Sequence, residues 1–236
     1  MKKIGLLFLS YFLFNLSFAQ EKESNLSVKF NLGTSFSKPA GDLGNVAGKG
    51  KSMQLLLQTE VGYHLSYNKS TKFGVKFAGV VGQDWANFLS NDALTELKVS
   101  VPNLKARIYP LSFQGDVFKG LEKIMPKNLP FAIELPIGIA LVSSISSLHF
   151  DYGLGFGKIT ETAYIDEYDF NDQTVNRTMR YFGWGFQPQI YRSDSEKWIV
   201  NAMFDFGKYS WTNANGGTSS FKTSQVGFGA QYNFLN

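Results

Sequence analysis

Apolar and polar residues alternate along much of this chain. The clearest stretch is residues 226–234, V-G-F-G-A-Q-Y-N-F, where every second residue is apolar or aromatic. Alternation with a period of two places the two sets on opposite faces of a β-strand. The stretch also has about the 9–11 residues that a tilted strand needs to cross a bilayer. It therefore predicts a membrane strand that ends in aromatic residues.

The same pattern recurs in eight segments, at residues 26–36, 53–67, 73–82, 97–108, 131–141, 182–190, 198–207 and 226–234. Within the fourth segment the apolar phase shifts after Pro102, which predicts a β-bulge there. We expect short turns at 68–71 and 192–196, and long loops at the opposite end, chiefly 143–178. The pattern predicts an all-β fold, an eight-stranded antiparallel up-and-down transmembrane β-barrel.

A ten-stranded barrel is the alternative. Residues 148–156 alternate well enough to form another strand. Residues 162–170 would then have to return through lipid with Asp166 and Glu167 adjacent, and one of these carboxylates would face the lipid. An external hairpin over 143–178 avoids this cost.

The predicted inward face carries charges of both signs, whereas the outward face carries almost none. A lipocalin-like soluble barrel would have the opposite arrangement. We expect the inward charges to pair across a narrow lumen as one network of Lys29, Glu60, Lys76, Lys98, Lys105, Arg107, Glu134 and Asp205.

Aromatic residues gather beside the short turns. They predict an interfacial girdle of Tyr67, Phe73, Tyr109, Tyr191, Trp198, Tyr232 and Phe234.

The first residues predict export. Two lysines precede an apolar run, and Ser17-Phe18-Ala19 provides a cleavage site, so we expect a signal peptide at 1–19 and a barrel domain at 20–236. The chain has no cysteine, which excludes a disulfide framework. Its formal net charge of +4 is too small to indicate a nucleic-acid partner. We expect the cell outer membrane as its location.

The chain resembles the small outer-membrane β-barrel families, the PorT-like group among them. The resemblance lies in the signal ending F-A-Q, in residues 97–110 and 181–191, and in the closing strand. Members are variously structural, adhesive or accessories of protein secretion, so the resemblance implies an architecture and assigns no functional residue.

Three features could carry chemistry, and each has a simpler structural explanation. Ser146, Ser147, His149 and Asp151 resemble the residues of a lipid-modifying site, but such residues coincide often by chance, and a rim position explains them. The acidic run 166–172 could bind Ca²⁺, although it lacks the EF-hand spacing. Residues 116–125 predict a short periplasmic helix, either at the membrane surface or as a lid.

We therefore expect a non-enzymatic outer-membrane barrel, structural or surface-binding through external loops, with no catalytic, metal or cofactor site. A narrow diffusion channel or an accessory of protein secretion is the alternative, and a lipid-modifying enzyme fits least well. Expected partners are outer-membrane lipid and, through the C-terminal strand, the barrel-assembly machinery; the sequence identifies no external ligand.

Overall fold

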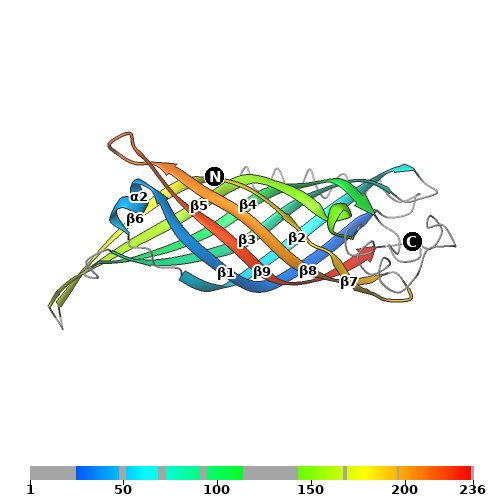
Figure 1. Ribbon diagram of the computed structural model, residues 1–236, viewed down its shortest axis with the longest axis horizontal. Helices are drawn as coiled ribbons and strands as arrows, with labels where there is room; N and C mark the ends of the chain where they lie inside the picture. The colour runs from blue at the N-terminus through cyan, green and yellow to red at the C-terminus, as the bar shows by residue number, and fades with distance from the viewer. Residues whose placement is uncertain are drawn as a thin grey trace, which may run out of the picture.

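The computed structural model describes residues 25–47, 52–68, 73–90, 95–113, 143–166, 169–195 and 197–234. These form, in order, β1 (Leu26–Gly41), α2 (Asp42–Val46), β2 (Ser52–Asn68), β3 (Phe73–Leu89), β4 (Thr95–Phe113), β5 (Leu148–Asp166), β6 (Asp169–Phe186), β7 (Gln189–Arg192), β8 (Trp198–Thr212) and β9 (Thr218–Phe234). Apart from β6 and β7, consecutive strands pair antiparallel, and β1 pairs with β9 to close the ring (Figure 1). Since β6 and β7 both pair with β8, they act as one wall strand. The predicted eight-stranded up-and-down barrel is confirmed.

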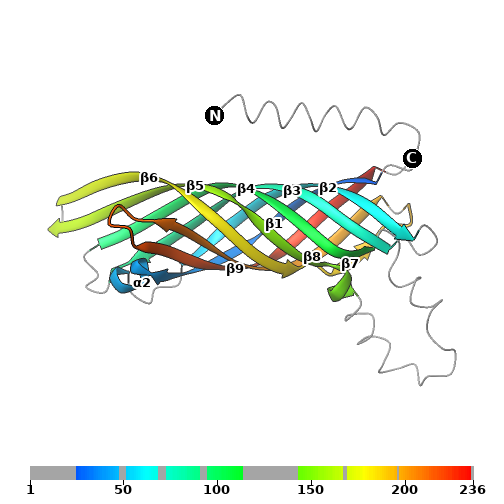
Figure 2. The same ribbon diagram turned by 90° about the horizontal axis from the view of Figure 1, so that it is seen from above.

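The two ends of the barrel differ. The terminal end holds both ends of the described chain, together with the β2–β3 and β7–β8 connections (Figure 1). The hairpin end holds α2 and the β3–β4, β5–β6 and β8–β9 connections. The β5–β6 hairpin projects beyond the other strands there (Figure 2). The strands β4 and β5 are also connected at the terminal end, the side on which the sequence predicts the periplasmic segment 116–125.

Across the membrane-length part of the strands, alternation separates an apolar outer face from a polar inner face. Outward residues such as Phe30, Met53 and Phe228 are 62%, 64% and 64% exposed. On β8 the outward apolar residues run from 198 to 206 and are followed by outward Lys208. This is about the length that a tilted strand needs to cross a bilayer. The outward apolar residues of neighbouring strands form a continuous belt, which we call the apolar band.

Residues 143–178, predicted to be an external loop, instead form a short helical turn, β5 and most of β6. β5 has 19 residues and β6 has 18, about twice the length that a membrane strand needs, so their last described pair, Asp166 and Asp169, lies beyond the apolar band. The crossing of lipid by acidic residues, which was the reason to expect a loop here, is therefore not required. The expected strand 131–141 and helix 116–125 lie outside the described residues, as does the predicted signal peptide.

The predicted bulge at Pro102 is absent from the described pairing. Pro102 pairs with Gln83 in an unbroken register, and Leu97, Val99 and Val101 continue the inward parity of β4. The apolar residues change face because the interior of the barrel becomes apolar towards the hairpin end. The segment expected to be a loop from residue 83 to 93 is also partly strand, since β3 continues to Leu89.

Among the described residues, no helix has the length and apolar character needed to cross a membrane.

Candidate functional site in the barrel lumen

The inward side chains of β4 lie along the interior of the barrel from the terminal end to the hairpin end. Starting from the terminal end they are Tyr109, Arg107, Lys105, Asn103, Val101, Val99 and Leu97. Polar residues thus occupy the half nearer the terminal end, and apolar residues occupy the half nearer the hairpin end. The contacts of these side chains divide the lumen into three layers.

The first layer is a cluster of six charges, which we call the central ion cluster. Its members are Lys29, Glu60, Lys76, Arg107, Asp151 and Asp205. All six are buried. Three cations face three carboxylates, so the formal charges cancel, as a buried set of charges requires.

Arg107 is the centre of this cluster. Its Nε and one terminal nitrogen each donate to Asp151 at 2.7 Å, a bidentate pair. The same terminal nitrogen donates to Asp205 at 2.7 Å, and the other terminal nitrogen donates to Glu60 at 3.2 Å. A planar guanidinium can serve several carboxylates in this way, whereas a lysine ammonium group could not reproduce the bidentate geometry.

Glu60 connects Arg107 to the two lysines. Lys76 Nζ lies 2.6 Å from one Glu60 oxygen, and Lys29 Nζ lies 3.4 Å from the other. Tyr109 donates its hydroxyl hydrogen to Glu60 at 2.9 Å and accepts from Lys29 at 3.1 Å. Lys29 also donates to the Gln187 side-chain oxygen. Side chains from six wall strands are therefore held in one network across the lumen.

The second layer, which we call the Asp84 layer, lies next towards the hairpin end. Lys105 Nζ and Asn103 Nδ2 lie 3.3 and 3.2 Å from Asp84 Oδ2, and Tyr209 donates to the same oxygen. Gln225 donates to the other Asp84 oxygen at 3.0 Å. Lys105 Nζ also lies 3.9 Å from the centre of the Tyr181 ring, a cation–π contact.

The third layer is apolar and fills the hairpin end, and we call it the apolar plug. It consists of Ala47, Ala86, Phe88, Leu97, Val99, Val101, Met179, Tyr181, Tyr209, Trp211 and Phe221. The Phe221 ring stacks on Tyr209 with centroids 5.0 Å apart and also contacts Phe88 and Trp211. Residues of this type exclude water from the interior of the barrel.

Inward glycines do not leave an open path, because larger neighbours fill the space beside them. A Cβ on Gly207 would lie 2.1 Å from the Tyr181 hydroxyl, and one on Gly62 would lie 2.2 Å from Lys76 Cε. A Cβ on Gly155 would lie 2.4 Å from a Val101 methyl group. Small and large inward residues on adjacent strands therefore complement each other, as expected in an eight-stranded barrel with a filled interior.

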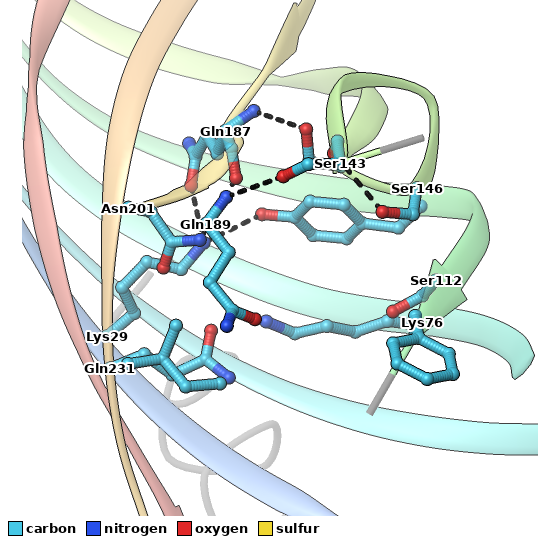
Figure 3. Close-up of a pocket in the computed structure, with 13 residues that line it drawn as sticks. Lys29, Lys76, Ser112, Ser143, Ser146, Gln187, Gln189, Asn201 and Gln231 are labelled. Carbon is cyan, nitrogen blue, oxygen red and sulfur yellow. Dashed lines mark hydrogen bonds between the residues drawn. The ribbon is translucent and has the colours of Figure 1, made fainter. Parts of the chain in front are cut away.

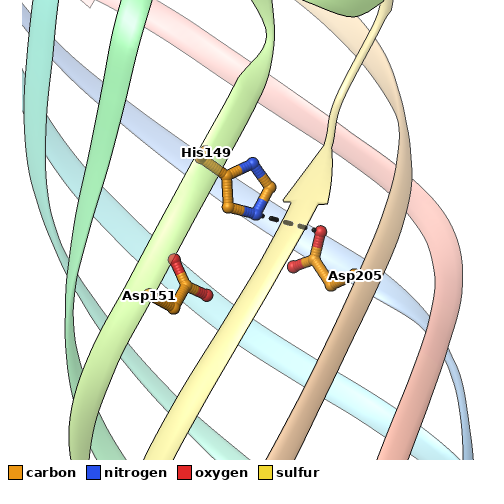
Figure 4. A group of neighbouring side chains, drawn as sticks. All are labelled: His149, Asp151 and Asp205. Carbon is orange, nitrogen blue, oxygen red and sulfur yellow. Dashed lines mark ion pairs between the residues drawn. The ribbon is translucent and has the colours of Figure 1, made fainter.

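The structure brings His149, Asp151 and Asp205 together with ligand atoms within 4.8 Å of one another (Figure 4). Such a set could in principle hold a metal ion. Here Arg107 already binds both carboxylates at 2.7 Å, and His149 Nε2 lies 3.3 Å from Asp205. A divalent cation would have to displace the guanidinium, so the geometry favours an ion pair.

The serines considered as nucleophiles do not engage His149. Ser146 and Ser147 donate to the backbone oxygens of Ser143 and Ser144. His149 Nδ1 lies 3.3 Å from the backbone oxygen of Ser147, and Asp151 is bonded to Arg107. Nucleophile and base are thus not in hydrogen-bond contact, as a catalytic pair would require. These residues also lie near the terminal end, not at an external rim.

A cavity of about 70 Å³ opens at the terminal end (Figure 3). Its lining is polar and includes Ser112, Ser143, Gln189 and Asn201. Lys29, Lys76 and Tyr109 line it as well, and these same three side chains contact Glu60. The central ion cluster therefore borders the cavity on its inner side.

The structure places the predicted network residues in three settings. Lys29, Glu60, Lys76, Arg107 and Asp205 meet in the central ion cluster, and Lys105 belongs to the Asp84 layer. Lys98 is not inward: its side chain is 60% exposed and pairs with Glu96. It has the parity of Pro102 and Leu104, which also face outward on β4. Glu134 lies outside the described residues.

Sequence reasoning missed Asp84 and Asp151 as lumen residues. A signal existed for Asp84, which has the inward parity of Lys76 and Gly82 but fell in a segment expected to be a loop. Asp151 fell likewise in the segment predicted to be an external loop.

Most of the predicted girdle lies on the outer face near the terminal end. Tyr191, Trp198 and Phe234 are exposed there, and Tyr232 packs between Trp198 and Phe234 with centroids 5.0 Å from each. Phe73 contacts Phe113, with ring centroids 4.6 Å apart. Tyr67 is the second-to-last residue of β2, next to the β2–β3 turn. Tyr109 does not belong to the girdle. It shares the inward parity of Arg107 and contacts Lys29 and Glu60 in the lumen.

No family model and no curated protein matches the chain. Among solved structures it is similar to Ail, the attachment invasion locus protein of Yersinia pestis, with 12% identity over 89% of this chain and 100% of that chain and a TM-score of 0.40. It is also similar to Neisserial surface protein A, with 11% identity over 91% and 100% and a TM-score of 0.39. A third is OprG, an outer membrane protein of Pseudomonas aeruginosa, with 12% identity over 89% and 97% and a TM-score of 0.31.

At these identities and TM-scores, the similarity does not assign a function to this chain. The PorT-like resemblance stays a prediction.

Proposed function

We propose that this chain is an integral outer-membrane protein whose barrel is closed to solutes and whose hairpin end contacts partners outside the cell. The observation that carries the proposal is the three-layered filling of the lumen, by the central ion cluster, the Asp84 layer and the apolar plug. In this proposal the protein is not an enzyme, and surrounding lipid is its permanent partner. Recognition of β9 by the barrel-assembly machinery is a further part of the proposal.

The apolar band supports a membrane location. Soluble monomers rarely expose contiguous apolar patches larger than a few hundred Å². Here large apolar residues are exposed on every long strand of the wall. A closed ring also satisfies the backbone hydrogen bonds of strands that lie in lipid.

The β5–β6 hairpin supports contact at the surface. β5 and β6 pair with each other out to Asp166 and Asp169, whereas β6 pairs with β8 only from Arg180 to Phe186. Within the described residues, the segment 169–179 of β6 therefore has an unpaired edge on the β8 side. An exposed edge offers backbone donors and acceptors to an extended segment of another protein.

A diffusion channel is the alternative that this filling disfavours. Eight-stranded barrels have interiors that side chains can fill, whereas 16–18-stranded porins leave an aqueous channel. A permeating solute would have to part ion pairs that join Glu60, Arg107 and Asp205, and then enter the apolar plug.

Single-cysteine labelling in intact cells tests the placement of the two ends, since the chain has no cysteine of its own. Asn176→Cys on the hairpin and Ala214→Cys in the β8–β9 turn should react with a membrane-impermeant maleimide. The matched control, Asp194→Cys at the exposed β7–β8 turn, should react only after permeabilisation. Labelling of Asp194→Cys, but of neither hairpin-end cysteine, in intact cells would contradict the proposal.

A further inference from the structure

Four basic residues follow one another around the outside of the barrel on four neighbouring wall strands. They are Lys38 on β1, Lys222 on β9, Lys208 on β8 and Arg180 on β6, and all four are exposed. Lys222 is directly opposite both Lys38 and Lys208 (β1, β9 and β8 lie side by side in Figure 1). Arg180 is opposite Ser210, two residues beyond Lys208. We call this set the basic row.

This arrangement is unfavourable for the protein alone. Like charges directly opposite each other on adjacent strands destabilise a sheet. Within the part of the chain that the structure describes, no member of the basic row forms an ion pair. An anion bound across the row would relieve the repulsion between these residues.

The basic row lies where the apolar band ends towards the hairpin end. Phe206 is the outward residue before Lys208, Phe182 is the outward neighbour of Arg180, and Phe36 precedes Lys38 in the same way. Aromatic and basic side chains at this border are typical of the depth of lipid headgroups. At the terminal end, the described border carries exposed Tyr191, Trp198 and Phe234 beside exposed Lys197. The basic row differs from that border because its lysines are directly opposite one another on adjacent strands.

We propose that the basic row binds the phosphate groups of a multiply phosphorylated lipid in the leaflet at the hairpin end. The acyl chains of this lipid lie along the apolar band. Adjacent strands are about 4.8 Å apart, so a row across four strands spans roughly 15 Å. That span needs more than one phosphate to pair all four cations. This inference goes beyond the proposed function and depends on it only for the placement of the barrel in a membrane.

Native mass spectrometry of the full chain tests the proposal. The probes are a bisphosphorylated disaccharide glycolipid, its monophosphorylated form and phosphatidylglycerol. The wild-type chain should retain the bisphosphorylated lipid most strongly. Lys222→Gln removes the central lysine and should weaken this binding about fivefold, the equivalent of one basic residue near an anionic surface.

Lys158→Gln is the matched control, because Lys158 is exposed on the outer face of β5 but is opposite Ser100 and Asn176. It should leave binding nearly unchanged. Equal losses in the two variants, or equal retention of phosphatidylglycerol by the wild-type chain, would overturn the proposal.

Thermal unfolding in vesicles gives a second readout, because the Tm shift caused by Lys222→Gln should change sign with the lipid composition. In phosphatidylcholine vesicles, Lys222→Gln should raise the Tm, because it removes repulsion from Lys38 and Lys208. In vesicles that contain the bisphosphorylated lipid, it should lower the Tm, because it removes a phosphate contact. A shift of the same sign in both vesicles would refute the basic row as a lipid site and leave the membrane barrel intact. Failure of the wild-type chain to insert at all would instead refute the proposed function.

Discussion

Glu60 joins three cations in the interior of this barrel. Lys29, Lys76 and Arg107 all lie within 3.4 Å of its oxygens, and the carboxylate is fully buried. Burial of so many charges is favourable only while each has its partners, because the desolvation cost of an unpaired ion is large. The stability of the barrel therefore depends strongly on single residues of this cluster.

Glu60→Ala should destabilise the barrel by ~3–5 kcal/mol, because it leaves buried cations without their shared carboxylate. Urea unfolding of the chain reconstituted in vesicles measures this change in free energy. Glu96→Ala is the matched control, since Glu96 pairs with the exposed Lys98 on the outer face. Its cost should be only ~0–1 kcal/mol. An effect of Glu60→Ala no larger than that of Glu96→Ala would show that the lumen is solvated.

Strand parity made most of this cluster predictable from the sequence. Lys29, Glu60, Lys76, Arg107 and Asp205 alternate with apolar neighbours, so each could be assigned to the inward face without knowing its partners. Parity reasoning could not place Tyr109, because an aromatic residue suits both the interfacial girdle and the lumen. Its hydrogen bonds to Lys29 and Glu60 show that its side chain lies in the lumen. Partners across the lumen depend on strand tilt and register, which no single segment reveals.

At the scale of elements, the strands are longer than a membrane requires. β4 and β5 each have 19 residues, about twice the roughly 9–11 of a membrane strand. Beyond the apolar band the polarity inverts: Leu97 and Val99 turn inward, while Lys98 and Lys158 face outward. This part resembles a soluble barrel and explains the apparent phase shift at Pro102. Sequence reasoning that assumed one polarity for the whole barrel had to infer a bulge there and a loop at 143–178.

The outer part of the β5–β6 hairpin should be dispensable for folding. Ala163 and Asn171 are directly opposite each other, so a two-residue Asn-Gly turn could join them in place of residues 164–170. Because the described pairing of β4 with β5 ends at Ala163 and that of β6 with β8 begins only at Arg180, the shortened chain should keep its heat-dependent shift in electrophoretic mobility and its Tm. Loss of the folded form would show that the hairpin stabilises the barrel and does not merely project from it.

At the scale of the whole molecule, the barrel has a closed wall, a filled interior and two different borders. Seven of the eight wall strands and most of the central ion cluster followed from the sequence, because alternation and parity are local properties. The strand β5 did not, since residues 143–178 were expected to form a loop, and the expected strand 131–141 lies outside the described residues. The order of the three lumen layers also did not follow from the sequence. The apolar plug combines Phe88, Val99, Tyr209 and Phe221 from four strands, and only the closed ring brings them together. Side chains from adjacent strands, Tyr181, Lys76 and Val101, fill the space beside the inward glycines.

Single-channel recording in planar bilayers is the most direct test of the central claim that the lumen is closed. After insertion of the full chain, verified by its heat-dependent electrophoretic mobility, we predict no steady current above the leak of the bare bilayer. A 16-stranded porin in the same bilayer serves as the open control. Steady, repeated open levels from the wild-type chain would contradict the account, since current cannot pass while the central ion cluster, the Asp84 layer and the apolar plug are all in place.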